Sequence, residues 1–206
     1  MVAILAVSGA CGRAPNAASS TPSNTIAPSP SPSPTSSPTA IASPPAGWQV
    51  YRDDQFGFSI FYPPGFVVDN PGSNTLPAPW LRERRVVDKQ YQNVSPPGQI
   101  DIGVYSIDAD TLTAWVQKHT GPCGSQVSNA FFWDVVRNLT TVTAAGRQAV
   151  SFDWDMSSCG ASLTVHETAF FMGSAYVFRL DWWALDPAYA TTLQQYAQQI
   201  LATFQG

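Results

Sequence analysis

Four charged residues in the second half of the chain have types and spacing suited to holding a cation: Asp153, Asp155, Arg179 and Asp181. Residues two apart on a strand share a face at about 6.8 Å, so Asp153 and Asp155 could share an ion such as calcium, which binds carboxylate oxygens. The competing interpretation, which the sequence favours, is an ion pair with Arg179 on a solvated face of a sheet.

A second candidate site is a basic run. It consists of Arg82-Glu83-Arg84-Arg85, with Lys89 after it and Trp80 before it. Such a run could bind an acidic partner, and Trp80 strengthens this hypothesis because Trp and Arg are enriched at binding hot spots. More commonly a basic run is a solvated loop, and the sequence favours a loop here, within residues 70–98.

Two cysteines lie in turn-like contexts, in the segments Gly121-Pro122-Cys123-Gly124-Ser125 and Ser157-Ser158-Cys159-Gly160. In an oxidising compartment the pair predicts a disulfide, which would stabilise the fold by about 3–4 kcal/mol in the chain-entropy model. The alternative is a nucleophilic cysteine, but neither histidine has a spacing that implies a base for it. No zinc site is expected, because two distant histidines and paired cysteines do not make a ligand set.

Other chemistry receives no support from motifs or charge. The sequence contains no Gly-rich phosphate loop and no nucleophile-elbow pattern, so we expect no catalytic residues and no cofactor. After position 46 there are nine basic and fourteen acidic residues, which gives a formal charge of −5. This balance argues against a nucleic-acid partner, which requires a basic face.

The first eleven residues resemble an export signal. Met1 to Ala10 are apolar or small, and the segment Val7-Ser8-Gly9-Ala10-Cys11 resembles the end of a bacterial lipoprotein signal peptide, in which small residues precede a lipidated cysteine. The alternative is an apolar N-terminus with a stray thiol. The pattern favours lipidation at Cys11, and hence an exported protein anchored at the extracytoplasmic face of a membrane.

Residues 12–46 differ in composition from everything after them. They contain nine of the eighteen prolines, one charged residue and no aromatic residue. Such a segment has too little apolar surface to offset the entropy of ordering it. It is therefore expected to be a disordered tether, and residues 47–206 are expected to form one folded domain.

Period-two alternation predicts most elements of that domain. It favours strands over 56–62, 66–68, 99–107, 147–155, 162–172 and 176–182, with short turns that make the last three antiparallel neighbours. A short helix capped by Asp108 or Asp110 should carry Leu112 and Trp115. A second helix should begin with Asp186 as its N-cap and Pro187 at its first position, and should lie across the apolar face of the sheet. The opposite face should be polar, with Asp153, Asp155, Arg179 and Asp181, joined by Tyr105 and Trp183.

A family resemblance rests on the opening of the domain, which reads Gly57-Phe58-Ser59-Ile60-Phe61-Tyr62-Pro63-Pro64-Gly65-Phe66 with Tyr51 before it. This segment resembles PsbP-like domains, named for an extrinsic protein of photosystem II, which open with an aromatic-rich hairpin and a Tyr-Pro turn. The paired strands and terminal helix are also similar. The resemblance implies an α+β fold with helices packed on an antiparallel sheet, in a family that contains many lipoproteins and assembly factors. No functional residue of the family maps onto this chain by motif.

Two classes of function remain open on the sequence. The first, which the resemblance favours, is a binding or assembly module of the cell envelope with an envelope protein as its partner. The second is a small-ligand carrier or enzyme that uses the polar sheet face. A deep pocket lined by Tyr105, Asp153, Arg179 and Asp181 would favour the second class.

Overall fold

The computed structural model describes residues 43–70, 80–121, 135–155 and 163–206. Cys11, most of the proposed tether, Cys123 and Cys159 lie outside the described residues. Lipidation, the tether and the disulfide therefore remain predictions. None of the helices within the described ranges is long and apolar enough to cross a membrane.

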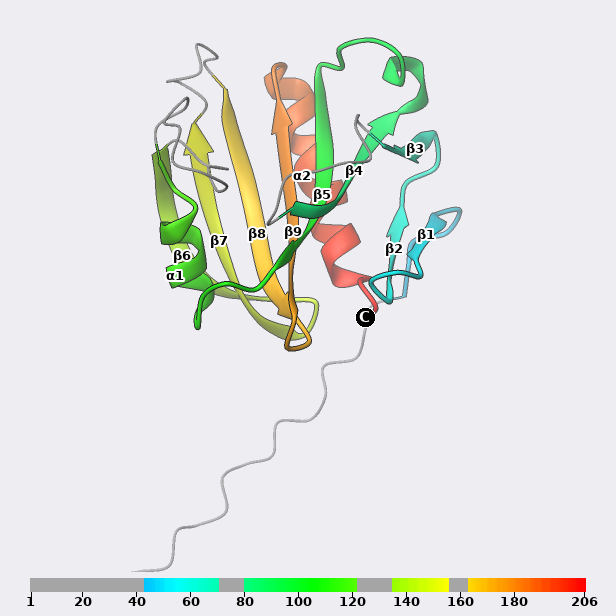
Figure 1. Ribbon diagram of the computed structural model, residues 1–206. Helices are drawn as coiled ribbons and strands as arrows, with labels where there is room; N and C mark the ends of the chain where they lie inside the picture. The colour runs from blue at the N-terminus through cyan, green and yellow to red at the C-terminus, as the bar shows by residue number, and fades with distance from the viewer. Residues whose placement is uncertain (1–42, 71–79, 122–134, 156–162) are drawn as a thin grey trace, which may run out of the picture. The chain divides into compact units, whose positions relative to one another are not determined.

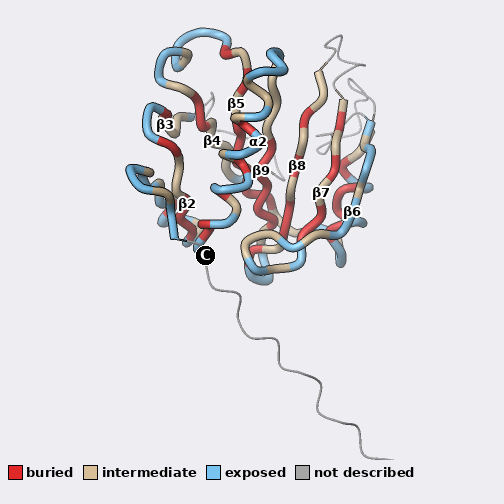
Figure 2. Tube along the Cα trace, turned by 180° about the vertical axis from the view of Figure 1, so that it is seen from behind, coloured by how far each residue is buried: buried red, intermediate tan, exposed pale blue. Residues whose placement is uncertain are grey.

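A seven-stranded antiparallel sheet forms the centre of the domain (Figure 1). Its strand order is β3-β4-β5-β9-β8-β7-β6. The strands are β3 (Phe66–Asp69), β4 (Trp80–Asp88), β5 (Gly98–Ser106), β6 (Val135–Ala144), β7 (Arg147–Asp155), β8 (Thr164–Met172) and β9 (Tyr176–Ala184). Buried residues concentrate in the central strands β5, β8 and β9, whereas β6 at one edge is largely exposed (Figure 2).

A separate hairpin pairs β1 (Gln49–Asp53) with β2 (Phe58–Tyr62). It is the aromatic-rich segment that opens the domain. Phe58 and Ile60 from β2 are buried in the main hydrophobic core, and Ser59 forms an isolated bridge with Gln205 near the C-terminus. The hairpin is thus joined to the rest of the domain by apolar packing, and to the C-terminal segment at Gln205 by backbone hydrogen bonds.

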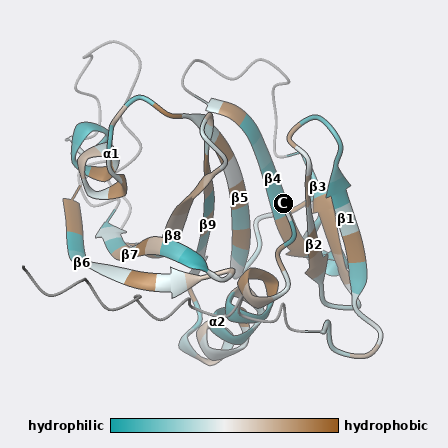
Figure 3. Cartoon of the chain, turned by 90° about the horizontal axis from the view of Figure 1, so that it is seen from below, coloured by the Kyte–Doolittle hydropathy of each residue, from teal (hydrophilic) through white to brown (hydrophobic). Residues whose placement is uncertain are grey.

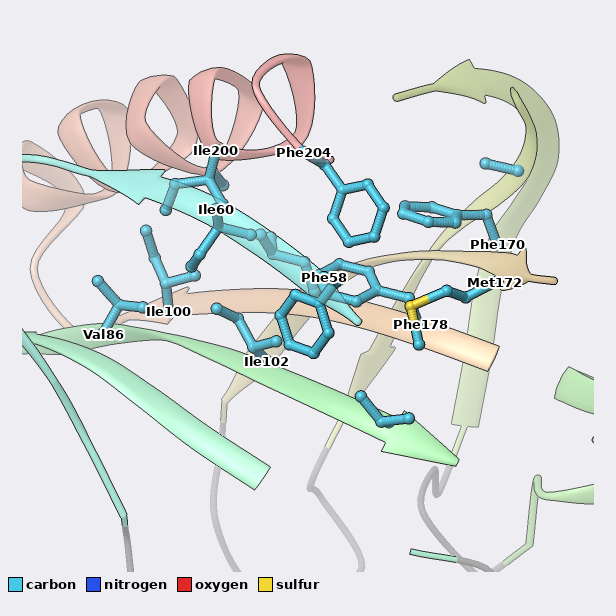
Figure 4. Packing of buried hydrophobic residues seen from close by; sticks show 14 of the residues in the cluster. Phe58, Ile60, Val86, Ile100, Ile102, Phe170, Met172, Phe178, Ile200 and Phe204 are labelled. Carbon is cyan, nitrogen blue, oxygen red and sulfur yellow. The ribbon is translucent and has the colours of Figure 1, made fainter. Parts of the chain in front are cut away.

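The C-terminal helix α2 (Pro187–Ala202) begins as the sequence predicted. The Asp186 carboxylate accepts a hydrogen bond from the amide of Ala188, and Pro187 occupies the first turn. The buried stripe of the helix, which includes Leu193 and Ile200, packs on one face of the sheet. Figure 4 shows Ile200 and Phe204 above the aromatic and aliphatic side chains of that core. We call this side of the sheet the α2 face.

The short helix α1 (Leu112–Lys118) packs on the opposite side, which we call the α1 face (Figure 3). Trp115 and Val116 contribute to a second core with Phe152 and other side chains of the α1 face. The expected Asp cap is wrong, because the hydroxyl of Thr111 accepts the capping bond from Ala114. Asp108 is instead paired with Lys118 and His119.

The prediction of a loop across the basic run is also wrong. Arg82, Arg84 and Arg85 lie in β4, which pairs with β3 on one side and with β5 on the other. The strand escaped the sequence pattern because charged residues occupy both of its faces. A register shift between Trp80 and Arg82 marks an irregularity at its start, of the kind that redirects a side chain.

Candidate functional site: a buried charged cluster

Charged side chains are buried together on the α1 face of the central strands. Asp101 of β5 is paired in register with Asp181 of β9, which is paired with Glu167 of β8. Arg179 lies two residues before Asp181 on the same face. Each of these four residues is at most 7% exposed. We call them, together with the aromatic residues Trp80 and Tyr105, the Arg179 cluster.

Arg179 is the only Arg or Lys buried among the described residues, and it compensates the charge of the acids around it. Its guanidinium lies 3.2 Å from the carboxylate of Asp181 and 3.8 Å from that of Glu167. Its Cζ lies 5.7 Å from the ring centre of Trp80 and 5.4 Å from that of Tyr105, which are cation–π distances. Carboxylates and aromatic rings therefore hold this cation from several sides.

Gly103 determines where the Tyr105 ring can lie. The two residues share a face of β5, and a Cβ atom at Gly103 would come within 2.5 Å of the Tyr105 ring carbon Cε2. The ring therefore lies over the glycine, where its face is presented to Arg179 and where it makes edge-to-face contacts with Trp80 and Trp115. A side chain at position 103 would exclude this arrangement.

Burial raises the pKa of both paired aspartates, Asp101 and Asp181. Burial, together with the neighbouring Asp181 charge, raises the pKa of Asp101 to about 8, although hydrogen bonds from Gln99 oppose the shift. Burial also raises the pKa of Asp181 to about 7, against the opposing effect of Arg179. The amide of Gln99 contacts both carboxylate oxygens of Asp101 at 2.8 Å. The pair therefore retains a proton at neutral pH.

Asp153 and Asp155 do not join the Arg179 cluster, so the prediction of one shared polar face is wrong for them. Phe152 and Trp154 of β7 pack in the α1-face core, and strand alternation therefore places Asp153 and Asp155 on the α2 face. Asp155 is paired with Arg137 at 2.7 Å. The predicted ion pair with Arg179 is therefore wrong for Asp155, and Arg179 is paired instead with Asp181 and Glu167.

The geometry around Asp153 and Asp155 does not support the calcium hypothesis. The oxygens of Asp153 and Asp155 contact donors of their own chain, at His166 and Asn138 for the first and at Arg137 and Thr164 for the second. Within the described part of the chain, no group of three or more His, Cys, Asp or Glu residues is placed to hold a metal ion.

The three arginines of the basic run form ion pairs and hydrogen bonds within the domain. Arg82 is paired with Asp53 of the hairpin at 2.8 Å, and Arg84 donates to the hydroxyl of Tyr51 at 3.1 Å. Arg85 is paired with Asp69 of β3 at 2.8 Å. These arginines attach the hairpin and the edge strand to β4, so they are not presented together to an acidic partner.

Comparisons with known proteins support the architecture. No family model matches the sequence, and no curated protein matches it. The chain is similar to the solution structure of cyanobacterial PsbP, also called CyanoP, from Synechocystis sp. PCC 6803. The TM-score is 0.50 at 12% sequence identity, over 77% of this chain and 91% of that one. The fold is PsbP-like. At this identity the similarity concerns the fold alone.

The sequence predicted some residues of the Arg179 cluster and missed others. It placed Arg179, Asp181 and Tyr105 together, and the structure does so, but it expected a solvated face. Asp101 and Glu167 were missed, although Asp101 lies directly between two apolar residues, Ile100 and Ile102. An acid within such a strand is a signal for a buried charge, which must have a partner. Trp80 was assigned to the basic run, yet the irregular start of β4 places its ring beside Arg179.

Proposed function

We propose that this chain is a membrane-anchored, extracytoplasmic binding or assembly module whose partner, an envelope protein, contacts the α1 face around the Arg179 cluster. Lipid attached to Cys11 would anchor it, and residues 12–46 would hold the domain away from the membrane. In this proposal the domain recognises its partner and catalyses no reaction.

The observation that carries the proposal is the closed arrangement of the Arg179 cluster. The guanidinium and the carboxylates of Asp181 and Glu167 are engaged with one another and 0–5% exposed, so they are not presented as acids, bases or nucleophiles. Burying charges in this way costs free energy that an apolar core would not require. These mutual contacts fix the strands that carry the partly exposed Trp80 and Trp183, and such preorganisation favours docking of a partner on that face.

The rim of the cluster has suitable composition for a protein partner. Trp80 and Trp183 are only partly buried and pack beside the α1-face core. Gln99, opposite Trp183 in the β5–β9 register, is partly exposed as well. Partly exposed Trp side chains around a rigid polar centre are typical of binding hot spots.

The pocket expected for the alternative function, a carrier or enzyme using the polar sheet face, does not form from the predicted residues. That site required Tyr105, Asp153, Arg179 and Asp181 to converge. Asp153 lies on the α2 face, whereas the other three lie on the α1 face. The sheet thus separates Asp153 from the other three residues.

Site-specific photocrosslinking in intact cells tests the proposal. A benzophenone amino acid at Trp183 should crosslink to one discrete envelope protein, whereas the same probe at Gln195, exposed on α2, should not. Trp80→Ala should reduce the Trp183 crosslink. A crosslink pattern identical at both positions, or none at Trp183, would contradict the proposal. Fatty-acid labelling that survives Cys11→Ala would contradict the anchor.

A further inference from the structure

A polar hollow of about 170 Å³ lies between α2 and the strands β7, β8 and β9, on the α2 face. Its lining includes the polar residues Ser151, Asp153, His166, Glu167, Thr168, Gln194 and Gln198, together with Trp182. Both glutamines project from one side of α2, one helical turn apart. This hollow lies on the side of the sheet away from the Arg179 cluster.

A chain of hydrogen bonds fixes the histidine at this hollow. His166 Nδ1 lies 2.6 Å from Asp153 Oδ1, and the side-chain amide of Asn138 donates to Asp153 Oδ2 at 2.7 Å. Asn138 has a φ of +54°, within the irregularity where β6 shifts register against β7. Such a bulge re-aims a side chain, and here it directs the Asn138 amide onto the carboxylate that orients His166.

The consequence is a defined hydrogen-bond acceptor at the hollow. When Nδ1–H donates to Asp153, the lone pair of an uncharged imidazole lies on Nε2. The ring stacks on Trp182, with centroids 4.2 Å apart and planes inclined by 24°, so its orientation is held by packing as well. The His166 side chain remains 41% exposed, so solvent or a ligand can reach it.

We propose that this hollow binds a neutral saccharide unit. None of the described residues that line it is Lys or Arg, so no cation is there to bind a phosphate or carboxylate group. The amides of Gln194 and Gln198 and the Thr168 hydroxyl each donate and accept, as adjacent sugar hydroxyls do. The imidazole and indole rings offer apolar surface to the C–H face of a sugar. The volume suits one ring and not an extended lipid chain.

The proposal is independent of the partner-docking function, because the two sites occupy opposite faces of one sheet. A variant at Gln198 should impair the saccharide site and leave the Trp183 photocrosslink unchanged. Trp80→Ala should have the opposite pattern. Failure of either proposal would therefore be visible without failure of the other.

Two-dimensional NMR of the full-length chain tests the saccharide site. The probes are the methyl glycosides of glucose, galactose and mannose, and N-acetylglucosamine, each titrated to its solubility limit, with glucuronate as an anionic comparison. At least one neutral probe should shift the Trp182 indole and His166 imidazole signals in a saturable manner. Glucuronate should bind more weakly than the neutral sugar with the same hydroxyl arrangement.

Matched variants assign the binding to these residues. Gln198→Ala and the near-isosteric Thr168→Val should each weaken binding by about tenfold, the factor that 1.4 kcal/mol gives. Gln195→Ala and Gln199→Ala, exposed on the same helix and outside the hollow, should leave it unchanged. Saturable shifts that persist equally in all four variants would overturn the proposal. So would the absence of saturable shifts with every neutral probe, or preference for glucuronate.

Discussion

The Arg179 cluster and the Asp153–His166 pair use similar side chains on one sheet but differ in exposure. The Arg179 and Asp181 side chains are 5% and 4% exposed, whereas those of His166 and Asp153 are 41% and 24% exposed. In the first region, burial raises the pKa values of Asp101 and Asp181 and confines the charges to one another. In the second, the imidazole remains reachable. The difference teaches that burial, more than residue type, decides whether a charged group supports the fold or meets a ligand.

Among the variants that test this comparison, removing Arg179 should cause the largest loss of folding stability. Arg179→Met leaves Asp181 and Glu167 without their shared cation, and breaking a buried pair in this way costs about 3–5 kcal/mol. Chemical denaturation of the full-length chain should show this loss. Arg137→Met, at an arginine with a 49% exposed side chain, is the matched control and should cost under about 1 kcal/mol. Similar losses in the two variants would contradict the structural role of the cluster.

The next effect concerns pH. The pKa of Asp101 is raised to about 8 in the folded protein, above its ordinary value near 4. The native state therefore binds more protons between these values, and stability should fall as pH rises from about 4 to 8. Asp101→Asn should flatten this decline, while Asp181, with a pKa raised to about 7, preserves part of it. Denaturation midpoints across this range, with Asp110→Asn as an exposed control, measure the slope. A decline of wild-type steepness in Asp101→Asn would refute the assignment.

A smaller loss is expected at Gly103, because a methyl group there would overlap the Tyr105 ring. Gly103→Ala should destabilise the domain by about 1–3 kcal/mol, the usual range for overpacking. Tyr105→Ala removes the ring, so the double variant should lose less than the sum of the two single variants. Additive losses would show that the ring does not occupy the space over the glycine. Thermal or chemical unfolding of the four proteins completes the cycle.

Sequence patterns predicted the fold better than they predicted the site. The Asp186-Pro187 start of α2 and the alternation in β5, β7 and β9 are local signals, and the structure confirms them. The prediction of the sheet face occupied by Asp153 was wrong. Both faces of β7 pack against a helix or a core, and alternation alone does not tell which residues point to which face. β4 was missed because its arginines find partners on β1 and β3, residues far away in sequence. Long-range pairing of this kind leaves no local pattern.

The smallest expected effect on stability is at Asp153, and it sharpens the comparison most directly. Asp153→Asn keeps the size of the side chain and replaces one carboxylate oxygen with an amide, so the partly exposed contact to His166 loses its charge but not its shape. Pairs of this exposure contribute about 0–1 kcal/mol, far less than Arg179 is expected to contribute. The free energy of unfolding of the variant should therefore lie within about 1 kcal/mol of that of the wild type.

Asp153→Asn should nevertheless weaken saccharide binding, because the Asn amide can present its N–H to Nδ1 and favour the tautomer that carries its proton on Nε2. The ¹⁵N chemical shifts of the imidazole report that tautomer. An unchanged tautomer together with a large loss of stability would place the Asp153–His166 pair among the structural contacts, alongside the Arg179 cluster.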